Sequence, residues 1–133
     1  MERSKKVLIV EDDNSIRDIL TEALTDSNYE VEAIADTKDI FHDIERVKPD
    51  IVLIDYLLPQ VNGGEICYQI KNNPRTKSLP VFMLSAYPKL INSLGNYGWD
   101  KLIEKPFNLW ELIDGIDEIL KKSALLDRNH NKH

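Results

Sequence analysis

The chain has 133 residues, of which 42% are hydrophobic and 30% are charged, and its formal net charge at pH 7 is -6. This length allows one ordinary domain rather than two, and this composition is typical of a soluble globular protein. The acidic balance argues against a protein whose main task is to grip nucleic-acid phosphates, and no apolar run approaches the ~20 residues that a membrane helix needs.

The first apolar run leads directly into a group of acids. Residues 7–10, VLIV, are continuous and rich in β-branched side chains, which predicts a strand covered on both faces. A helical stripe of apolar residues follows over 14–29, and Asn14 or Ser15 can cap its start. The pattern therefore predicts a strand, an acidic turn and a helix.

The same alternation continues through the middle of the chain. Residues 30–35 predict a weaker strand, and residues 36–48 predict a helix with Asp36 as its N-cap. DIVLID, residues 50–55, predicts a second fully buried strand. The proline, asparagine and glycines of 57–64 favour a loop.

The last third of the chain repeats the pattern less regularly. We expect a helix over 65–73 that packs Cys67 as an inert side chain, then a buried strand over 80–86. A proline and two glycines limit any helix in 87–98 to two or three turns, and 99–104 is a possible strand.

A strong amphipathic helix is expected near the C-terminus, over residues 108–122, where Asn108 and Glu111 have the spacing of a capping box. The polar residues 123–133 form either a frayed end or an extension of that helix. Five strands alternating with five helices predict an α/β fold, a doubly wound parallel sheet with helices on both faces. One domain, residues 5–122, is expected to carry it.

Polar side chains follow four of these strands at their carboxyl ends, where open parallel sheets bind ligands. They are Glu11, Asp12, Asp13, Asp55, Ser85 and Lys105. Carboxylates held close together repel one another, so either one takes up a proton or a cation lies between them. Oxygen donors of this kind suit Mg²⁺, and a hydroxyl and an ammonium group can hold phosphoryl oxygens. The joint placement predicts a metal and phosphate site.

Each of these residues also has an ordinary explanation when it is taken alone. Asp13 is expected to be a helix cap or a solvated acid, Ser85 a structural serine and Lys105 a solvated lysine. Only their convergence at the same edge of the sheet favours a functional interpretation.

With these motifs in place, the sequence resembles the receiver domains of two-component response regulators over about residues 5–121. The resemblance rests on four segments in the family's order and spacing. These are VLIVEDD with NSIRDIL, then PDIVLIDYLLPQVNGGE with its Asp55, Pro59 and Gly63, then LPVFMLSA, and finally LIEKPF. It implies the flavodoxin-like strand order 2-1-3-4-5.

The resemblance also implies roles for the site residues. Asp55 would accept a phosphoryl group from a phosphohistidine on a sensor kinase or a histidine phosphotransfer protein. Ser85 would bond that group and report its presence, and Lys105 would pair with it, or with Asp55 before phosphorylation. The Lys105–Pro106 peptide would be cis, as is typical of the family. The Mg²⁺ ligands would be Glu11, Asp12, Asp55 and the main-chain carbonyl of Leu57.

Two departures from the family pattern lie away from this site. Leu102 stands where the family usually has an aromatic switch residue, so Tyr97 or Trp99 are candidates to replace it. The segment from Ser85 to Lys105 is about two residues short. Trp110, off the inward stripe of the last helix, is either a partly covered surface aromatic or an interface contact, since aromatics are enriched at interfaces.

The sequence is therefore interpreted as a stand-alone cytoplasmic receiver with Mg²⁺ as its cofactor. It would promote only its own phosphorylation and dephosphorylation, would bind neither nucleic acid nor membrane directly, and would be a monomer or a weak homodimer. One alternative is a phosphate-independent interaction module of the same fold. A haloacid-dehalogenase-type phosphatase is disfavoured because VEDD and Asn14 lack its Asp-x-Asp pattern, and EDDNS lacks the cradle of a flavin phosphate.

Overall fold

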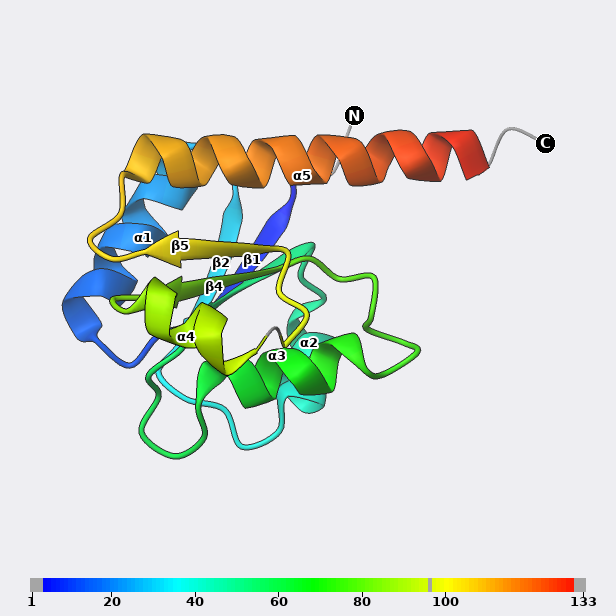
Figure 1. Cartoon of the computed structure of the whole chain (residues 1–133). Helices are drawn as coiled ribbons and strands as arrows, with labels where there is room; N and C mark the ends of the chain where they lie inside the picture. The colour runs from blue at the N-terminus through cyan, green and yellow to red at the C-terminus, as the bar shows by residue number, and fades with distance from the viewer. Residues whose placement is uncertain (1–3, 96, 131–133) are drawn as a thin grey trace.

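The computed structural model describes residues 4–95 and 97–130, with side chains as far as residue 122. Strands and helices alternate along these residues, as Figure 1 shows. In chain order they are β1 (Lys6–Val10), α1 (Asn14–Asp26), β2 (Glu30–Ile34), α2 (Ile40–Val47), β3 (Ile51–Asp55), α3 (Gly63–Lys71), β4 (Val81–Ser85), α4 (Pro88–Leu94), β5 (Lys101–Glu104) and α5 (Leu109–His130). The expected alternation is confirmed.

The strands form one parallel sheet in the order β2-β1-β3-β4-β5, which confirms the flavodoxin-like topology. The three central strands, β1, β3 and β4, are buried on both faces, which is why their sequences are almost continuously apolar. The register places Val10 opposite Ile54 and Asp55 opposite Leu84. Because all five strands run in one direction, their carboxyl ends share one edge of the sheet.

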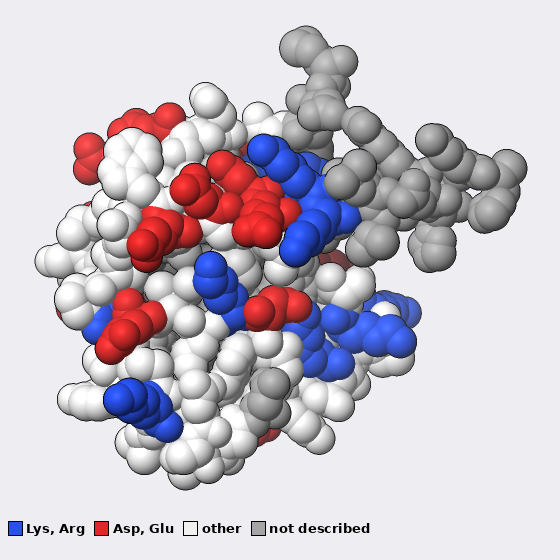
Figure 2. Space-filling model, turned by 45° about the horizontal axis from the view of Figure 1, so that its top comes forward, with Lys and Arg blue, Asp and Glu red and all other residues white. Residues whose placement is uncertain are grey.

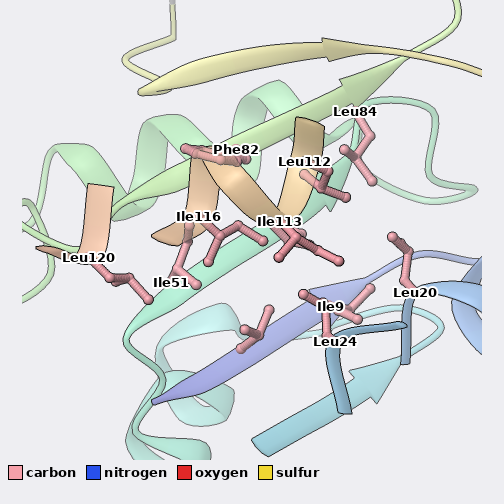
Figure 3. Close-up of a cluster of buried hydrophobic side chains, with 12 residues drawn as sticks. Ile9, Leu20, Leu24, Ile51, Phe82, Leu84, Leu112, Ile113, Ile116 and Leu120 are labelled. Carbon is pink, nitrogen blue, oxygen red and sulfur yellow. The ribbon is translucent and has the colours of Figure 1, made fainter. Parts of the chain in front are cut away.

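Two apolar layers hold the helices to the sheet. One lies between the sheet and α1 with α5, and Figure 3 shows side chains from both helices meeting those of the strands. It contains Ile9, Leu20, Leu24, Ile51, Phe82, Leu84, Leu112, Ile113, Ile116 and Leu120. The second layer lies on the opposite face, against α2 and α3, and includes the fully buried Cys67. Both faces of the sheet are thus covered.

The sequence offered several caps for α1, and the structure selects one of them. Asp13, not Asn14 or Ser15, caps α1, and its Oδ1 accepts a hydrogen bond from the Ile16 amide at 3.0 Å. Its backbone is extended, as an N-cap requires. The expectation that Asp13 is a cap is therefore correct.

At α2 the cap is Asp39 rather than Asp36, because Asp39 Oδ1 accepts from the amides of Phe41 at 3.0 Å and His42 at 3.4 Å. The intervening residues are not helical, so the helix begins at Ile40. Asp36 and Asp39 are both good caps by residue type, and the helix that begins after Asp39 buries Ile40 and Val47 against the sheet.

Several boundaries also move. α3 begins at Gly63, two residues before the expected start, because Asn62 caps it. α4 has seven residues and ends before Gly95, in agreement with the short helix expected there. At α5, Asn108 Oδ1 accepts from the amides of Trp110 and Glu111, which confirms Asn108 as the cap.

The α5 helix continues to His130, so the first residues after 122 extend it, one of the two forms expected. Residues 131–133 lie outside the described part, and the division at residue 122 stays a prediction. Within 4–95 and 97–130, no helix has the length and apolar content to cross a membrane.

Candidate functional site

Two acids follow β1 directly. Glu11 continues the ladder by one residue, since its amide donates to the Ile34 carbonyl at 3.0 Å, and its side chain is buried. Asp12, the next residue, is exposed. The chain then enters α1, so the strand fixes Glu11 tightly and Asp12 stands at the start of the turn.

Asp55 and Lys105 reach the same edge from two other segments. Asp55 is the last residue of β3 and is buried. Lys105 follows β5, and its amide donates to the Ser85 carbonyl at 2.8 Å. Its Nζ lies 3.0 Å from Asp55 Oδ1 and 3.1 Å from Glu11 Oε2. The expected pairing of Lys105 with Asp55 is present, and the pairing with Glu11 is additional.

The peptide bond between Lys105 and Pro106 is cis, as the resemblance predicted. The proline ends the strand, because its nitrogen carries no hydrogen for a ladder bond.

Burial opposes charge on both buried carboxylates. It raises the pKa of Glu11, and the negative charge of Asp55 adds to the rise, while Lys105 acts against it. The pKa of Asp55 is likewise raised by burial and by the charge of Asp12, against the hydrogen bonds from Lys105 and the Leu57 amide. For Lys105, burial alone would lower the pKa, but its contacts with Asp55 and Glu11 raise it overall. The site therefore favours added positive charge.

Three carboxylates can converge on one point. Glu11, Asp12 and Asp55 each offer an oxygen, and these oxygens lie within 4.8 Å of one another. Carboxylate oxygens are the donors that hard divalent cations prefer, and Mg²⁺ is bound through a few carboxylates with water completing its shell. The donor set fits such a cation chemically.

Ser85 and Leu57 border this cluster. Ser85, the last residue of β4, is buried, and its Oγ accepts a hydrogen bond from the Tyr87 amide at 2.9 Å. The Leu57 amide donates to the Asp55 carboxylate, and the Leu57 side chain is exposed. The roles assigned to the Ser85 hydroxyl and to the Leu57 carbonyl remain predictions.

The candidate switch residues lie outside the cluster. Leu102 is half-buried and packs against the apolar layer on the α2 and α3 side. Trp110 is 77% exposed, and the choice between a surface aromatic and an interface contact stays a prediction. Tyr97 shares a hydrogen bond with Tyr56, the neighbour of Asp55, and its ring centroid lies 5.9 Å from that of Trp99.

Cys67 is packed in the interior, as expected. It is fully buried, and burial raises the pKa of its thiol to about 12, so almost no thiolate forms near neutral pH.

Two contacts of the site were not anticipated from the sequence. One is the pairing of Lys105 with Glu11, which needs the strand order before it can be foreseen. The other is Arg17, whose guanidinium donates to the main-chain carbonyls of Glu11 and Asp12 at 2.9 and 3.4 Å. The sequence feature that could have pointed to this contact is an arginine one turn into a helix that follows two acids.

Comparison with known proteins agrees with this geometry. The family described as response regulator receiver domain matches residues 7–117. The phosphate regulon transcriptional regulatory protein PhoB of Pseudomonas aeruginosa is 31% identical over 122 residues, which cover 90% of this chain and 53% of that protein. The chain spans about half the length of the curated relatives it matches.

Solved structures give the same result. A CheY-like receiver domain protein from Methanospirillum hungatei is 30% identical, with a TM-score of 0.80 over 92% of this chain and 98% of that one. TrrA from Thermotoga maritima, solved in complex with Mg²⁺-BeF, is 25% identical, with a TM-score of 0.76 over 86% of this chain and 97% of that one.

The family match covers most of the chain, and the strand order and the residues gathered at the sheet edge agree with it. The chain therefore belongs to the family of response regulator receiver domains of two-component systems.

Proposed function

We propose that this chain accepts a phosphoryl group at Asp55 from a phosphohistidine of a partner protein, with Mg²⁺ held by Glu11, Asp12 and Asp55. The observation that carries the proposal is the position of the Asp55 carboxylate, within 4.8 Å of two further acids and 3.0 Å from the Lys105 ammonium. A carboxylate so placed has the Lys105 ammonium beside it and would gain a second positive neighbour once a cation is bound.

In the proposed transfer, an Asp55 carboxylate oxygen forms a bond to phosphorus as the bond from phosphorus to the donor imidazole nitrogen breaks. The donor histidine leaves with the electron pair of that bond and takes up a proton. Bound Mg²⁺ supplies charge that offsets the repulsion between the carboxylate and the incoming phosphoryl oxygens. Lys105 supplies further positive charge, and the Ser85 hydroxyl lies at the neighbouring strand end to donate to a phosphoryl oxygen.

Water later attacks phosphorus, and the bond from phosphorus to the Asp55 oxygen breaks, which releases inorganic phosphate and regenerates the Asp55 carboxylate. Under this proposal the chain turns over no separate substrate, and its output is a change of protein contacts. A donor of the sensor kinase or phosphotransfer class is supported by the membership of the family and by relatives such as PhoB. Binding of Mg²⁺-BeF by TrrA supports the metal.

The test is intact mass after incubation with acetyl phosphate, with and without Mg²⁺. We expect a gain of one phosphoryl group that requires Mg²⁺, is absent in Asp55→Asn and persists in Asp18→Asn. Asp18 is an exposed aspartate of α1, so its variant makes the same chemical change away from the cluster. No gain by the folded, Mg²⁺-loaded chain would instead favour a phosphate-independent interaction module.

A further inference from the structure

Arg17, on α1, makes hydrogen bonds that the proposed chemistry does not explain. Its Nη1 donates to the carbonyl oxygens of Glu11 at 2.9 Å and Asp12 at 3.4 Å, and a second guanidinium nitrogen, Nη2, donates to Asn14 Oδ1. Within the described residues, these acceptors are two main-chain carbonyls and an amide, and none is a carboxylate. The guanidinium therefore holds the backbone of the turn between β1 and α1, and it does not neutralise an acid.

The two carbonyls belong to the two residues whose carboxylates converge with Asp55. The amide of Glu11 is fixed by β2, but Asp12 lies past the ladder in an exposed turn. Arg17 itself is anchored, because its amide donates to the Asp13 carbonyl at 2.9 Å in the first turn of α1. Its side chain thus ties the turn to the rigid helix.

We propose that Arg17 is a positioning residue for the cation site: its planar guanidinium holds the backbone of Glu11 and Asp12 so that both carboxylates point at one cation. This inference rests on the proposed function, since it assumes that the cation binds there. The planar group matters because it reaches several acceptors at once in fixed directions, whereas a lysine ammonium is a compact point charge.

The charge of Arg17 and its positioning role act on cation affinity with opposite signs. A positive charge near the cluster repels Mg²⁺, so its removal would tighten binding if charge dominated. Loss of the fixed backbone would weaken binding, because Asp12, which lies past the ladder, would lose its orientation, while Glu11 stays held by β2 and Lys105. Arg17 is half-buried and still reaches solvent, so water and salt screen part of its charge, and we expect the geometric effect to dominate.

The experiment is calorimetric titration of Mg²⁺ alone into the full chain. For Arg17→Met we expect the Mg²⁺ dissociation constant to rise about tenfold, the size typical of residues that orient metal ligands. Arg17→Lys keeps the charge without the planar group, and a smaller rise of about threefold is expected. The matched control is Arg46→Met, which removes the same charge from α2, where Arg46 pairs with Asp43 and Glu32.

A second readout separates positioning from chemistry. Phosphorylation of Arg17→Met by acetyl phosphate should need a higher Mg²⁺ concentration to reach half its maximal rate, because the lost interaction acts on metal binding, whereas Arg46→Met should need the same concentration as the unmodified chain. Should Arg17→Met fail to fold, Arg17→Lys and Asn14→Ala carry the test, both with weakened Mg²⁺ binding expected.

Equal or tighter Mg²⁺ binding by folded Arg17→Met, while the unmodified chain binds normally, would overturn this inference and leave the proposed function intact. If Arg17→Lys and Asn14→Ala are used instead, unchanged Mg²⁺ binding by both variants would also overturn this inference. Absence of Mg²⁺ binding by the unmodified chain would overturn both.

Discussion

The carboxyl edge of the sheet and the surface over β5 and α5 are built differently. At the edge, Glu11, Asp55 and Ser85 are the buried polar side chains of the described part, and Lys105 pairs with both acids. On the face that Figure 2 shows, with α5 brought forward, acidic and basic side chains lie next to one another at the surface. Trp110 on this helix is 77% exposed.

The difference reflects what each region can tolerate. Buried charges need partners in fixed positions, because an unpaired charge at low dielectric is costly. Exposed charges and aromatics are screened or solvated, so their positions are little constrained by stability. Substitutions at the edge should therefore lower the free energy of unfolding by several kcal/mol or close to it, whereas those on the α5 surface should change it little. Four predictions test this contrast, from the largest effect to the smallest.

Gly63→Ala should be the most damaging of them. A Cβ there would lie 2.3 Å from the Asp55 carbonyl oxygen and 2.8 Å from Ile54 Cγ2, and Cβ atoms in proteins do not come this close to non-bonded atoms. Since the clash is with the backbone of β3, we expect a loss of about 3 kcal/mol or more in the free energy of unfolding, measured by urea denaturation.

Gly115→Ala on α5 is the matched glycine. Its Cβ would meet the flexible end of Lys101 at 3.2 Å and Phe82 Cε2 at 3.4 Å, so the neighbours have little to move. Alanine is favoured over glycine within helices by about 1 kcal/mol, and we expect a neutral or slightly stabilising result. Equal losses for both variants would contradict the contrast between the two regions.

Lys105→Met should cost about 2 to 3 kcal/mol, because it leaves Glu11 and Asp55 buried without their cation. Protonation of one carboxylate limits the loss, since burial already raises both pKa values. Urea denaturation at neutral pH measures it. The control is Lys122→Met, an exposed α5 lysine 3.6 Å from Glu118, for which at most about 0.5 kcal/mol is expected. A Lys105 variant as stable as this control would show that the two acids do not need the ammonium group.

The fold and most of the site could be predicted from the sequence because both depend on strong local patterns. The continuous apolar runs of β1, β3 and β4 mark strands buried on both faces, and an α/β alternation leaves their ends at one edge. The proximity of Asp55 and Lys105 could be predicted because both follow strands that end at this edge.

The cap that was predicted wrongly and the contacts that were not predicted depended on a choice between similar residues or on residues far apart in the sequence. Asp36 and Asp39 are equivalent as caps by residue type, and the pairing of Glu11 with Lys105 joins residues 94 positions apart. Neither leaves a local signal. The contact of Tyr97 with Tyr56 is of the same kind, because it depends on how the segment before β5 folds back over α3.

Tyr97→Phe tests a side chain beside the carboxyl edge, because Tyr97 shares a hydrogen bond with Tyr56, the residue that follows Asp55. The variant removes the hydrogen bond to Tyr56 and keeps the ring that packs on Trp99, so we expect a loss of about 1 kcal/mol. Tyr68→Phe, at a half-exposed tyrosine of α3, is the control, with no more than about 0.5 kcal/mol expected. Thermal unfolding of the two variants in parallel gives the comparison, and an equal shift would mean that the hydrogen bond adds nothing measurable.

Of the four predicted losses, that of Trp110→Ala should be the smallest, although it removes the largest side chain. Because the indole is 77% exposed, little apolar area leaves water on folding, and the free energy of unfolding should change by no more than about 0.5 kcal/mol. Acetyl phosphate should still modify Asp55 to the same extent. Denaturation at two protein concentrations makes the test strict: a larger loss that grows with concentration would place Trp110 in a contact between copies, and one independent of concentration would mean that the α5 surface is as constrained as the carboxyl edge.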